Sequence, residues 1–201
     1  KPSEIIFSAG GTEANNLLIS GVMKLFPGAN CVVSSTEHDS VIKPAEQFDR
    51  RFIKVGGDGV IDTDSLKASI DDKTVLVSIH YANNETGVIQ PIRQVAKIIN
   101  QIRTNRQAIG NSLPLLFHTD ACQAPLFLDI HVSSLGVDAM TINAGKIYGP
   151  KQTGALYLSR SFQLSPYILG GGQERGIRSG TENLANIVGL SVALDIAQSN
   201  R

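Results

Sequence analysis

The sequence contains little that points to a membrane, a nucleic acid or a disulfide-rich fold. No apolar run approaches the roughly 20 residues that a membrane-spanning helix requires. Lysine and arginine number 18, as do aspartate and glutamate, and this balance argues against a non-specific nucleic-acid or membrane surface. The two cysteines, Cys31 and Cys122, are too few for a disulfide framework and favour a reducing compartment, so we expect a cytoplasmic protein.

Enough apolar sequence is present for a large core. Hydrophobic residues occupy 42% of the 201 positions and charged residues 18%, which is typical of a globular chain. The length suits one large α/β domain. The chain moves almost directly from Lys1 into a strand and stops at the end of a helical pattern, so we expect it to be trimmed at both ends.

Strand and helix patterns alternate along the chain. Apolar runs predict strands at 4–7, 29–35, 51–56, 74–82, 113–121, 137–143 and 154–159. Helical periodicity and capping residues predict helices at 12–26, from about 36–41 onward, 62–70, 91–103 and 181–198. The strands are continuously apolar, which indicates an α/β fold with a mostly parallel sheet flanked by helices on both faces.

Polar clusters follow five of the predicted strands. They read SAGGTE, STEH, ANNETG, HTDACQ and NAGK. Ligands of such sheets bind beyond the carboxyl ends of the strands. Because five polar strand ends are more than the connections require, the pattern predicts a binding site at this edge of the sheet.

Gly10, Gly11 and Thr12 directly precede a predicted helix. The free N–H groups and the dipole of a helix start favour an anion, and glycine lets a phosphate approach the backbone. The alternative is a plain helix start that Thr12 caps. No lysine follows at the spacing of a P-loop, and GGGQERG lacks the context of a dinucleotide fingerprint.

Asp120 ends a predicted strand, and His38 follows another strand end. A carboxylate at the depth of Asp120 needs a partner, which is either a cap or ion pair or, in a functional site, a ring nitrogen that it keeps protonated. Gln123 reaches the same side. His38 is either a helix cap or a flat ring that stacks on a flat cofactor with some acid–base capacity. The histidines that we interpret as structural are His80, His118 and His131.

Lys146 is the candidate nucleophile. It ends the stretch MTINAGK, where burial would remove its proton, as Schiff-base chemistry requires. A phosphate cradle, a carboxylate for a pyridine nitrogen, a stacking ring and a Schiff-base lysine are the parts of a pyridoxal 5'-phosphate site. The histidine, carboxylate and cysteine spacings are not those of a metal site.

Six ordered motifs then give a resemblance that runs from end to end. They are FSAGGTEANN, STEHDSV, HYANNETGVIQPI, HTDACQA, GKIYGPKQTGALY and GGGQERGIRSGTENLANIVG. In these motifs the sequence resembles the cysteine desulfurases of the class V aminotransferase group, of the iron–sulfur-cluster and nitrogen-fixation type. The resemblance implies an aspartate-aminotransferase-like fold in which residues 1–201 form the cofactor-binding large domain, without the C-terminal small domain.

The resemblance implies a role for each matching residue. Lys146 should hold the cofactor, Asp120 should pair with its ring nitrogen, and His38 should stack on its ring. Thr181 resembles the residue that reaches the phosphate of the other subunit, which implies a homodimer. The remaining expected contacts are Gly11 and Thr12 at the phosphate, Asn83 and Gln123 near the ring hydroxyl, and Arg175 and Arg178 in the loop of Thr181.

The match also has departures. Where the family carries a serine and a histidine shortly before the lysine, this sequence has Asn143 and Gly145. We keep both among the expected cofactor-binding residues, because Asn143 can still donate to a phosphate, but the missing imidazole implies weaker cofactor affinity. The sulfur-accepting cysteine and the substrate-binding arginine of the family lie beyond the part matched here, and neither Cys31 nor Cys122 corresponds to that cysteine.

The implied reaction removes sulfur from L-cysteine and leaves alanine and an enzyme persulfide, which passes to a sulfur-acceptor or scaffold protein for iron–sulfur cluster or thio-cofactor assembly. Lys146 and His38 should move the protons, and these 201 residues alone should be inactive. Two alternatives stay open. One is another class V enzyme, such as a selenocysteine lyase or an aminotransferase, although the GIRSGTEN loop disfavours the aminotransferase. The other is a non-catalytic scaffold domain with the cofactor fold, which the intact Lys146, Asp120 and His38 disfavour.

Overall fold

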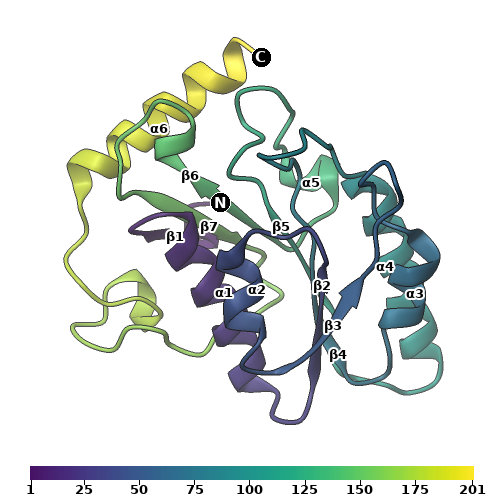
Figure 1. The fold of residues 1–201 in the computed structure, drawn as a ribbon. Coiled ribbons are helices and arrows are strands. Elements are labelled where there is room, and N and C mark those ends of the chain that lie inside the picture. Colours follow the sequence, from purple (N-terminus) through teal and green to yellow (C-terminus); the bar gives the residue numbers. More distant parts are fainter.

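The computed structural model describes residues 1–201, and its centre is one seven-stranded sheet (Figure 1). The strands lie in the order β1-β7-β6-β5-β4-β2-β3, and β7 runs antiparallel to both of its neighbours. Their bounds are β1 Ile5–Ser8, β2 Asn30–Ser34, β3 Asp49–Ile53, β4 Thr74–Ser78, β5 Leu116–Asp120, β6 Ala139–Asn143 and β7 Gly154–Leu158. The predicted mostly parallel sheet is confirmed.

Six α-helices surround the sheet. Their bounds are α1 Gly11–Leu25, α2 Asp39–Ala45, α3 Thr63–Ser69, α4 Ile92–Ala108, α5 Val132–Leu135 and α6 Leu184–Ser199, and the 3-10 turns are η1 Pro2–Glu4, η2 Ala144–Lys146 and η3 Glu174–Gly176. Asp62 caps α3, since its side chain accepts hydrogen bonds from the N–H groups of Asp64 and Ser65. Pro91 is the N-cap of α4, so this helix begins one residue later than predicted, and the short α5 was not predicted.

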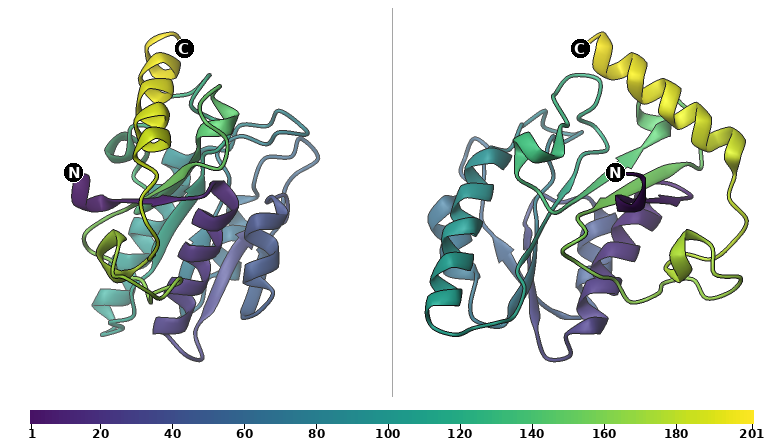
Figure 2. Two further views of the ribbon diagram at one scale, coloured as in Figure 1. Left: turned by 90° about the vertical axis from the view of Figure 1, so that its left-hand side faces the viewer. Right: turned by 180° about the vertical axis from the view of Figure 1, so that it is seen from behind.

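Two apolar cores cover the two faces of the sheet. Helices α1 and α2 pack on one face, and α3, α4 and α5 pack on the other (Figure 2). In β2 the side chains of Cys31 and Val33 enter the first core and that of Val32 enters the second, so the strand is buried on both sides. This explains the continuous apolar runs. The edge strand β3 departs from the prediction, because only its last residue is buried.

Helix α6 lies along one edge of the molecule (Figure 1). It buries Leu190 and Ala197 against Ala144 of η2, Ile147 directly after η2, and Ala155 of β7. Its outer side carries a stripe of exposed apolar side chains, which are Leu184, Val188, Val192 and Ile196. No helix combines the length and the apolar character that crossing a bilayer would take.

Candidate active site

The polar strand ends meet around one cavity of about 240 Å³. Residues that follow β1, β2, β4, β5 and β6 all line it, which confirms the predicted convergence at the carboxyl ends of the strands. The lining residues are Gly11, Thr12, Thr36, His38, Ser40, His80, Ala82, Asn83, Asn84, Asp120, Cys122, Gln123, Asn143 and Lys146. The volume is near the lower end of small-molecule sites, roughly 300 Å³.

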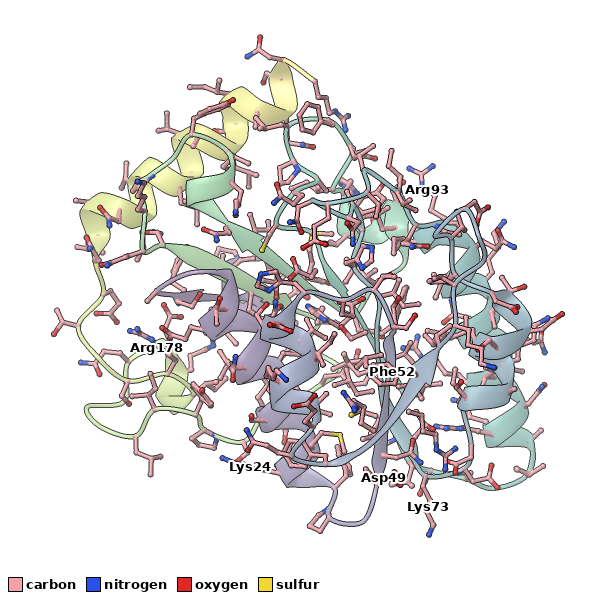
Figure 3. The ribbon with its side chains drawn as sticks, viewed as in Figure 1. Lys24, Asp49, Phe52, Lys73, Arg93 and Arg178 are labelled. Carbon is pink, nitrogen blue, oxygen red and sulfur yellow. The ribbon has the colours of Figure 1, made fainter.

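Thr181 is an expected site residue that the fold places away from this cavity. It lies in the segment before α6, in a separate hollow that Glu174 and Arg178 also line. Arg178 holds this segment against α1, because its guanidinium donates two hydrogen bonds to Glu13, at 2.6 and 3.2 Å, and Figure 3 labels Arg178 on that side of the molecule. Arg175 donates to the backbone oxygen of Ile5. Within one chain, therefore, neither arginine lines the cavity.

The start of α1 forms one wall of the cavity. The N-cap is Gly10, with φ of +140°, and no side chain caps the helix, so the alternative in which Thr12 serves as the cap is wrong. A β-carbon on Gly11 would lie 2.6 Å from the sulfur of Cys122, and glycine is therefore required by close packing. The first N–H groups of α1 stay available for an anion.

Asp120 is held by two hydrogen bonds and by no cation. Its Oδ1 accepts from the backbone N–H of Cys122 at 2.9 Å, and its Oδ2 accepts from the Asn15 amide at 2.7 Å. The ion-pair alternative is wrong, because no salt bridge involves this carboxylate. A carboxylate has about four lone-pair sites, so Asp120 can accept further hydrogen bonds from a group in the cavity.

His38 is the helix cap that the sequence offered as one alternative, and its ring also lines the cavity. As the N-cap of α2 it accepts a hydrogen bond at Nδ1 from the backbone N–H of Ser40, at 3.0 Å. The same ring lines the cavity and is exposed there. Capping with Nδ1 fixes the orientation of the ring and leaves its faces and Nε2 free for a ligand.

Lys146 ends the 3-10 turn η2 and lines the cavity. The prediction that burial desolvates this lysine is wrong for this chain, because η2 continues past β6 and leaves Lys146 exposed at the mouth. Asn143 caps η2 by accepting a hydrogen bond at Oδ1 from the Gly145 N–H, at 3.1 Å. The amide nitrogen of Asn143 is therefore free to donate, and Gly145 lies beside the cavity without lining it.

His80 and Glu37 are features of the site that the sequence did not reveal. We expected His80 to be purely structural, yet its buried ring lines the cavity, and Nε2 has no hydrogen-bond partner. Nδ1 lies 3.3 Å from Oε1 of Glu37. Burial raises the pKa of Glu37, although the nearby His80 opposes that rise. The available signal was the position of both residues within three residues of a strand end.

His118 matches its structural interpretation. The fully buried ring contacts the hydroxyl of Ser78 through Nδ1, at 2.9 Å, and that of Thr141 through Nε2, at 3.1 Å. Burial lowers the pKa of His118 to about 4, so the ring is neutral near pH 7. It supports the strands beneath Asp120 and does not line the cavity.

The two thiols are both poor nucleophiles. Cys31 is fully buried in β2, and burial raises its pKa to about 12. Cys122 lines the cavity, but burial and the Asp120 carboxylate raise the pKa of its thiol well above the ordinary value. A thiol with a raised pKa supplies little thiolate near pH 7, and the thiolate is the reactive form.

The whole chain, residues 1–201, matches the aminotransferase class-V family, and the chain belongs to that family. It is 39% identical over 204 residues to the cysteine desulfurase IscS of Dictyoglomus turgidum, covering 98% of this chain and 49% of that protein. It is 40% identical over 200 residues to the cysteine desulfurase IscS 1 of Archaeoglobus fulgidus, covering 96% and 49%. The chain thus spans about half the length of the curated relatives it matches.

The solved structures that superimpose on this chain include proteins similar to it in sequence as well as in fold. A NifS-like protein superimposes with a TM-score of 0.90 at 33% identity, covering 99% of this chain and 54% of that one. A structure described as SspA in complex with cysteine gives a TM-score of 0.85 at 35% identity, covering 97% and 56%. The fold is that of the NifS-like pyridoxal-phosphate enzymes, as the sequence predicted.

Proposed function

We propose that the protein to which this chain belongs is a pyridoxal-phosphate-dependent cysteine desulfurase, which converts L-cysteine to alanine and leaves the sulfur as an enzyme persulfide. The observation that carries this proposal is the meeting of Lys146, Asp120, His38 and the start of α1 around one cavity. The similarity to proteins named cysteine desulfurase supports it.

The residues around the cavity fit the cofactor. An amine at Lys146 can bond to its aldehyde, and Asp120, whose lone pairs are only partly used, can accept from its ring nitrogen. The N–H groups at Gly11 and Thr12 suit its phosphate, because the helix start has no other cap. The free amide nitrogen of Asn143 suits the phosphate as well.

The other expected ligands lie around the same cavity. His38 lines it from the end of β2, and Asn83 and Gln123 line it from the segments after β4 and β5, where they suit the ring oxygen. When bound, the cofactor supplies an electron sink that makes the α-proton of an amino acid removable. Lys146 and His38 are the groups that take up and return this proton.

We propose that the protein is a homodimer in which Thr181 contributes to the cofactor site of the partner subunit. Thr181 lies in a hollow apart from its own cavity, and the apolar stripe of α6 is exposed, and both observations support a second copy. Mixing Lys146→Ala with Thr181→Ala subunits tests the idea, because one site in each hybrid dimer is then intact. Recovery of cofactor binding is expected on mixing, and no recovery would refute the shared site.

L-Cysteine is the proposed substrate, and a sulfur-acceptor or scaffold protein for iron–sulfur cluster or thio-cofactor assembly is the proposed partner. The relative solved with cysteine supports the substrate. Two free cysteines support a reducing compartment, and we propose the cytoplasm. A substrate test separates this proposal from two alternatives. One is another class V enzyme, such as a selenocysteine lyase or an aminotransferase, and the other is a non-catalytic scaffold domain.

The test uses the whole protein loaded with pyridoxal phosphate. It is given cysteine, selenocysteine, or alanine with a 2-oxo acid, and alanine, sulfide, selenide and transamination products are measured. Cysteine should give alanine and sulfide in equal amounts in the presence of a reductant. Turnover of selenocysteine alone, or transamination, would identify a different class V enzyme, and the absence of both cofactor binding and turnover would favour the scaffold.

A further inference from the structure

A chain of hydrogen bonds, buried from Asp120 to Ser40, connects Asp120 to His38 through the side chains of Asn15 and Ser40. The Asn15 amide nitrogen donates to Asp120 Oδ2 at 2.7 Å and to Ser40 Oγ at 2.8 Å. Ser40 Oγ in turn lies 2.8 Å from His38 Nδ1. Asn15 is fully buried in α1, and Ser40 and Asp120 are at most 9% exposed.

The direction of this chain follows from the donor inventory. If the Asn15 amide were reversed, its oxygen would face the Asp120 carboxylate, so the nitrogen must occupy that position. Both hydrogens of this nitrogen are then used, one for Asp120 and one for Ser40. Ser40 Oγ accepts from Asn15, and its own hydrogen is left to donate to His38 Nδ1.

A second donor reaches the same ring nitrogen. The backbone N–H of Ser40 also points at His38 Nδ1, at 3.0 Å, as the cap of α2. A hydrogen on Nδ1 would face this N–H, so Nδ1 must be the unprotonated nitrogen. The neutral ring therefore carries its hydrogen on Nε2, the nitrogen that the cap leaves free.

The unused atom of Asn15 supports a role beyond packing. Its Oδ1 is buried and has no hydrogen-bond partner, which costs free energy in any folded protein. An apolar residue of similar shape would avoid this cost. Asn15 is better explained as a double donor that must reach Asp120 and Ser40 at the same time.

We propose that Asn15 is a positioning residue that orients the Asp120 carboxylate and directs the Ser40 hydroxyl at His38 Nδ1. This hydroxyl is a second donor beside the backbone N–H of Ser40, and together they hold the His38 ring with its hydrogen on Nε2. The inference deepens the proposed function, on which its catalytic meaning rests. It assigns His38 one orientation and one donor, Nε2–H, toward the cavity. It also links the residue proposed for the ring nitrogen to the residue proposed for the ring face.

The test is nitrogen NMR of the protein with ¹⁵N-labelled histidine and without cofactor. The His38 signals are assigned by their loss in His38→Gln. In the unmodified protein, the hydrogen should be on Nε2. In Asn15→Leu the Nδ1 resonance should move, because the Ser40 hydroxyl loses its Asn15 donor and is free to rotate away from Nδ1. The hydrogen should stay on Nε2, because the backbone N–H of Ser40 still points at Nδ1. Asn16→Leu is the matched control, since Asn16 lies in the same helix but bonds only to the Thr12 carbonyl.

Ser40→Ala interrupts the same chain from the other end and decides the matter if Asn15→Leu does not fold. It should also move the Nδ1 resonance, and Ser40→Thr, which keeps the hydroxyl, should restore it. A hydrogen on Nδ1 in the unmodified protein would overturn the proposal. So would a folded Asn15→Leu or Ser40→Ala protein with unchanged His38 signals. A failure of the proposed function would appear in the substrate test and would leave these signals untouched.

Discussion

Glu37 and His80 form a buried pair at the edge of the cavity, with Oε1 of Glu37 3.3 Å from Nδ1 of His80. Glu37 also accepts a hydrogen bond from the backbone N–H of His80, so it ties the segment after β2 to the segment after β4. Its other oxygen, Oε2, is buried without a partner. The pair thus lies between two of the five strand ends that build the site.

Glu37 should make stability depend on pH. Burial raises the pKa of this carboxyl above its ordinary value of 4.5 in the folded protein, against the opposing effect of His80. The protonated carboxyl of Glu37 therefore contributes to folding stability, and this contribution is fully present below pH 4.5. It is lost as pH rises through the pKa of Glu37 in the folded protein. Glu37→Gln removes this dependence. The unfolding free energy of the mutant, measured in urea from about pH 4 to about pH 8, should rise relative to that of the unmodified protein as pH rises.

The control for this prediction is Glu85→Gln, which removes an exposed carboxylate of the cavity-side loop after β4. Its stability should change in parallel with that of the unmodified protein across the same pH range. A difference between Glu37→Gln and the unmodified protein that stays constant with pH would contradict a raised pKa at Glu37.

Asp120→Asn should preserve the fold and impair chemistry. The amide has the shape of the carboxylate but cannot accept at both atoms, so one of the hydrogen bonds from Asn15 and Cys122 is lost, at a cost of about 1 kcal/mol. A nearby carboxylate favours a protonated ring by 1–3 pKa units. Exchange of the substrate α-proton in D₂O should therefore slow by about 10- to 1000-fold. Equal exchange rates in mutant and unmodified protein would remove Asp120 from this role.

Gly11→Ala should destabilise the protein through one identifiable contact. The added β-carbon would lie 2.6 Å from the Cys122 sulfur, closer than packed atoms approach. Overpacking of this kind typically costs about 1–3 kcal/mol. Adding Cys122→Ala removes the sulfur and should recover most of the loss in thermal unfolding experiments. If the double mutant is as unstable as Gly11→Ala with Cys122 intact, the strain has another source.

Lys146, rather than Lys151, should carry the cofactor. Lys146 lines the cavity, whereas Lys151 lies beyond the turn of Gly149 and Pro150 and does not line it. Each lysine is replaced with alanine, and visible absorbance is recorded after pyridoxal phosphate is added. Lys146→Ala should abolish the band of lysine-bound cofactor and Lys151→Ala should keep it. The opposite result would reverse the assignment.

The sequence predicted the strand ends well because the carboxyl ends of parallel strands must meet at one edge of a sheet. Polar residues at or shortly after those strand ends, such as Asp120 and His38, were therefore found. Asn15 was missed because it lies in the buried, apolar-patterned face of α1, where no local signal shows that its amide bonds to a residue 105 positions away. His80 was missed because it follows a buried run and resembles a core histidine.

The exposure of Lys146 shows another feature that sequence patterns do not predict, beside the buried contacts of Asn15 and His80. The apolar run before it correctly predicted β6, but the run carries no information about the 3-10 turn that brings the lysine to the mouth of the cavity. Thr181 is a further example. Its motif predicts a phosphate contact in another subunit, and one chain places it only at a separate hollow. Both positions depend on chain geometry that periodicity does not encode.

Residues 1–201 by themselves should not release sulfur from cysteine, even with pyridoxal phosphate bound. The attacking group must be a thiolate that approaches the substrate sulfur to roughly 3–3.5 Å. Cys31 is fully buried with a pKa of about 12, and the thiol of Cys122 also has a raised pKa and is packed against Gly11. The protein, cofactor, cysteine and a reductant are mixed, and sulfide and alanine are measured. Repeated turnover that disappears in Cys122→Ser would instead make Cys122 the sulfur acceptor.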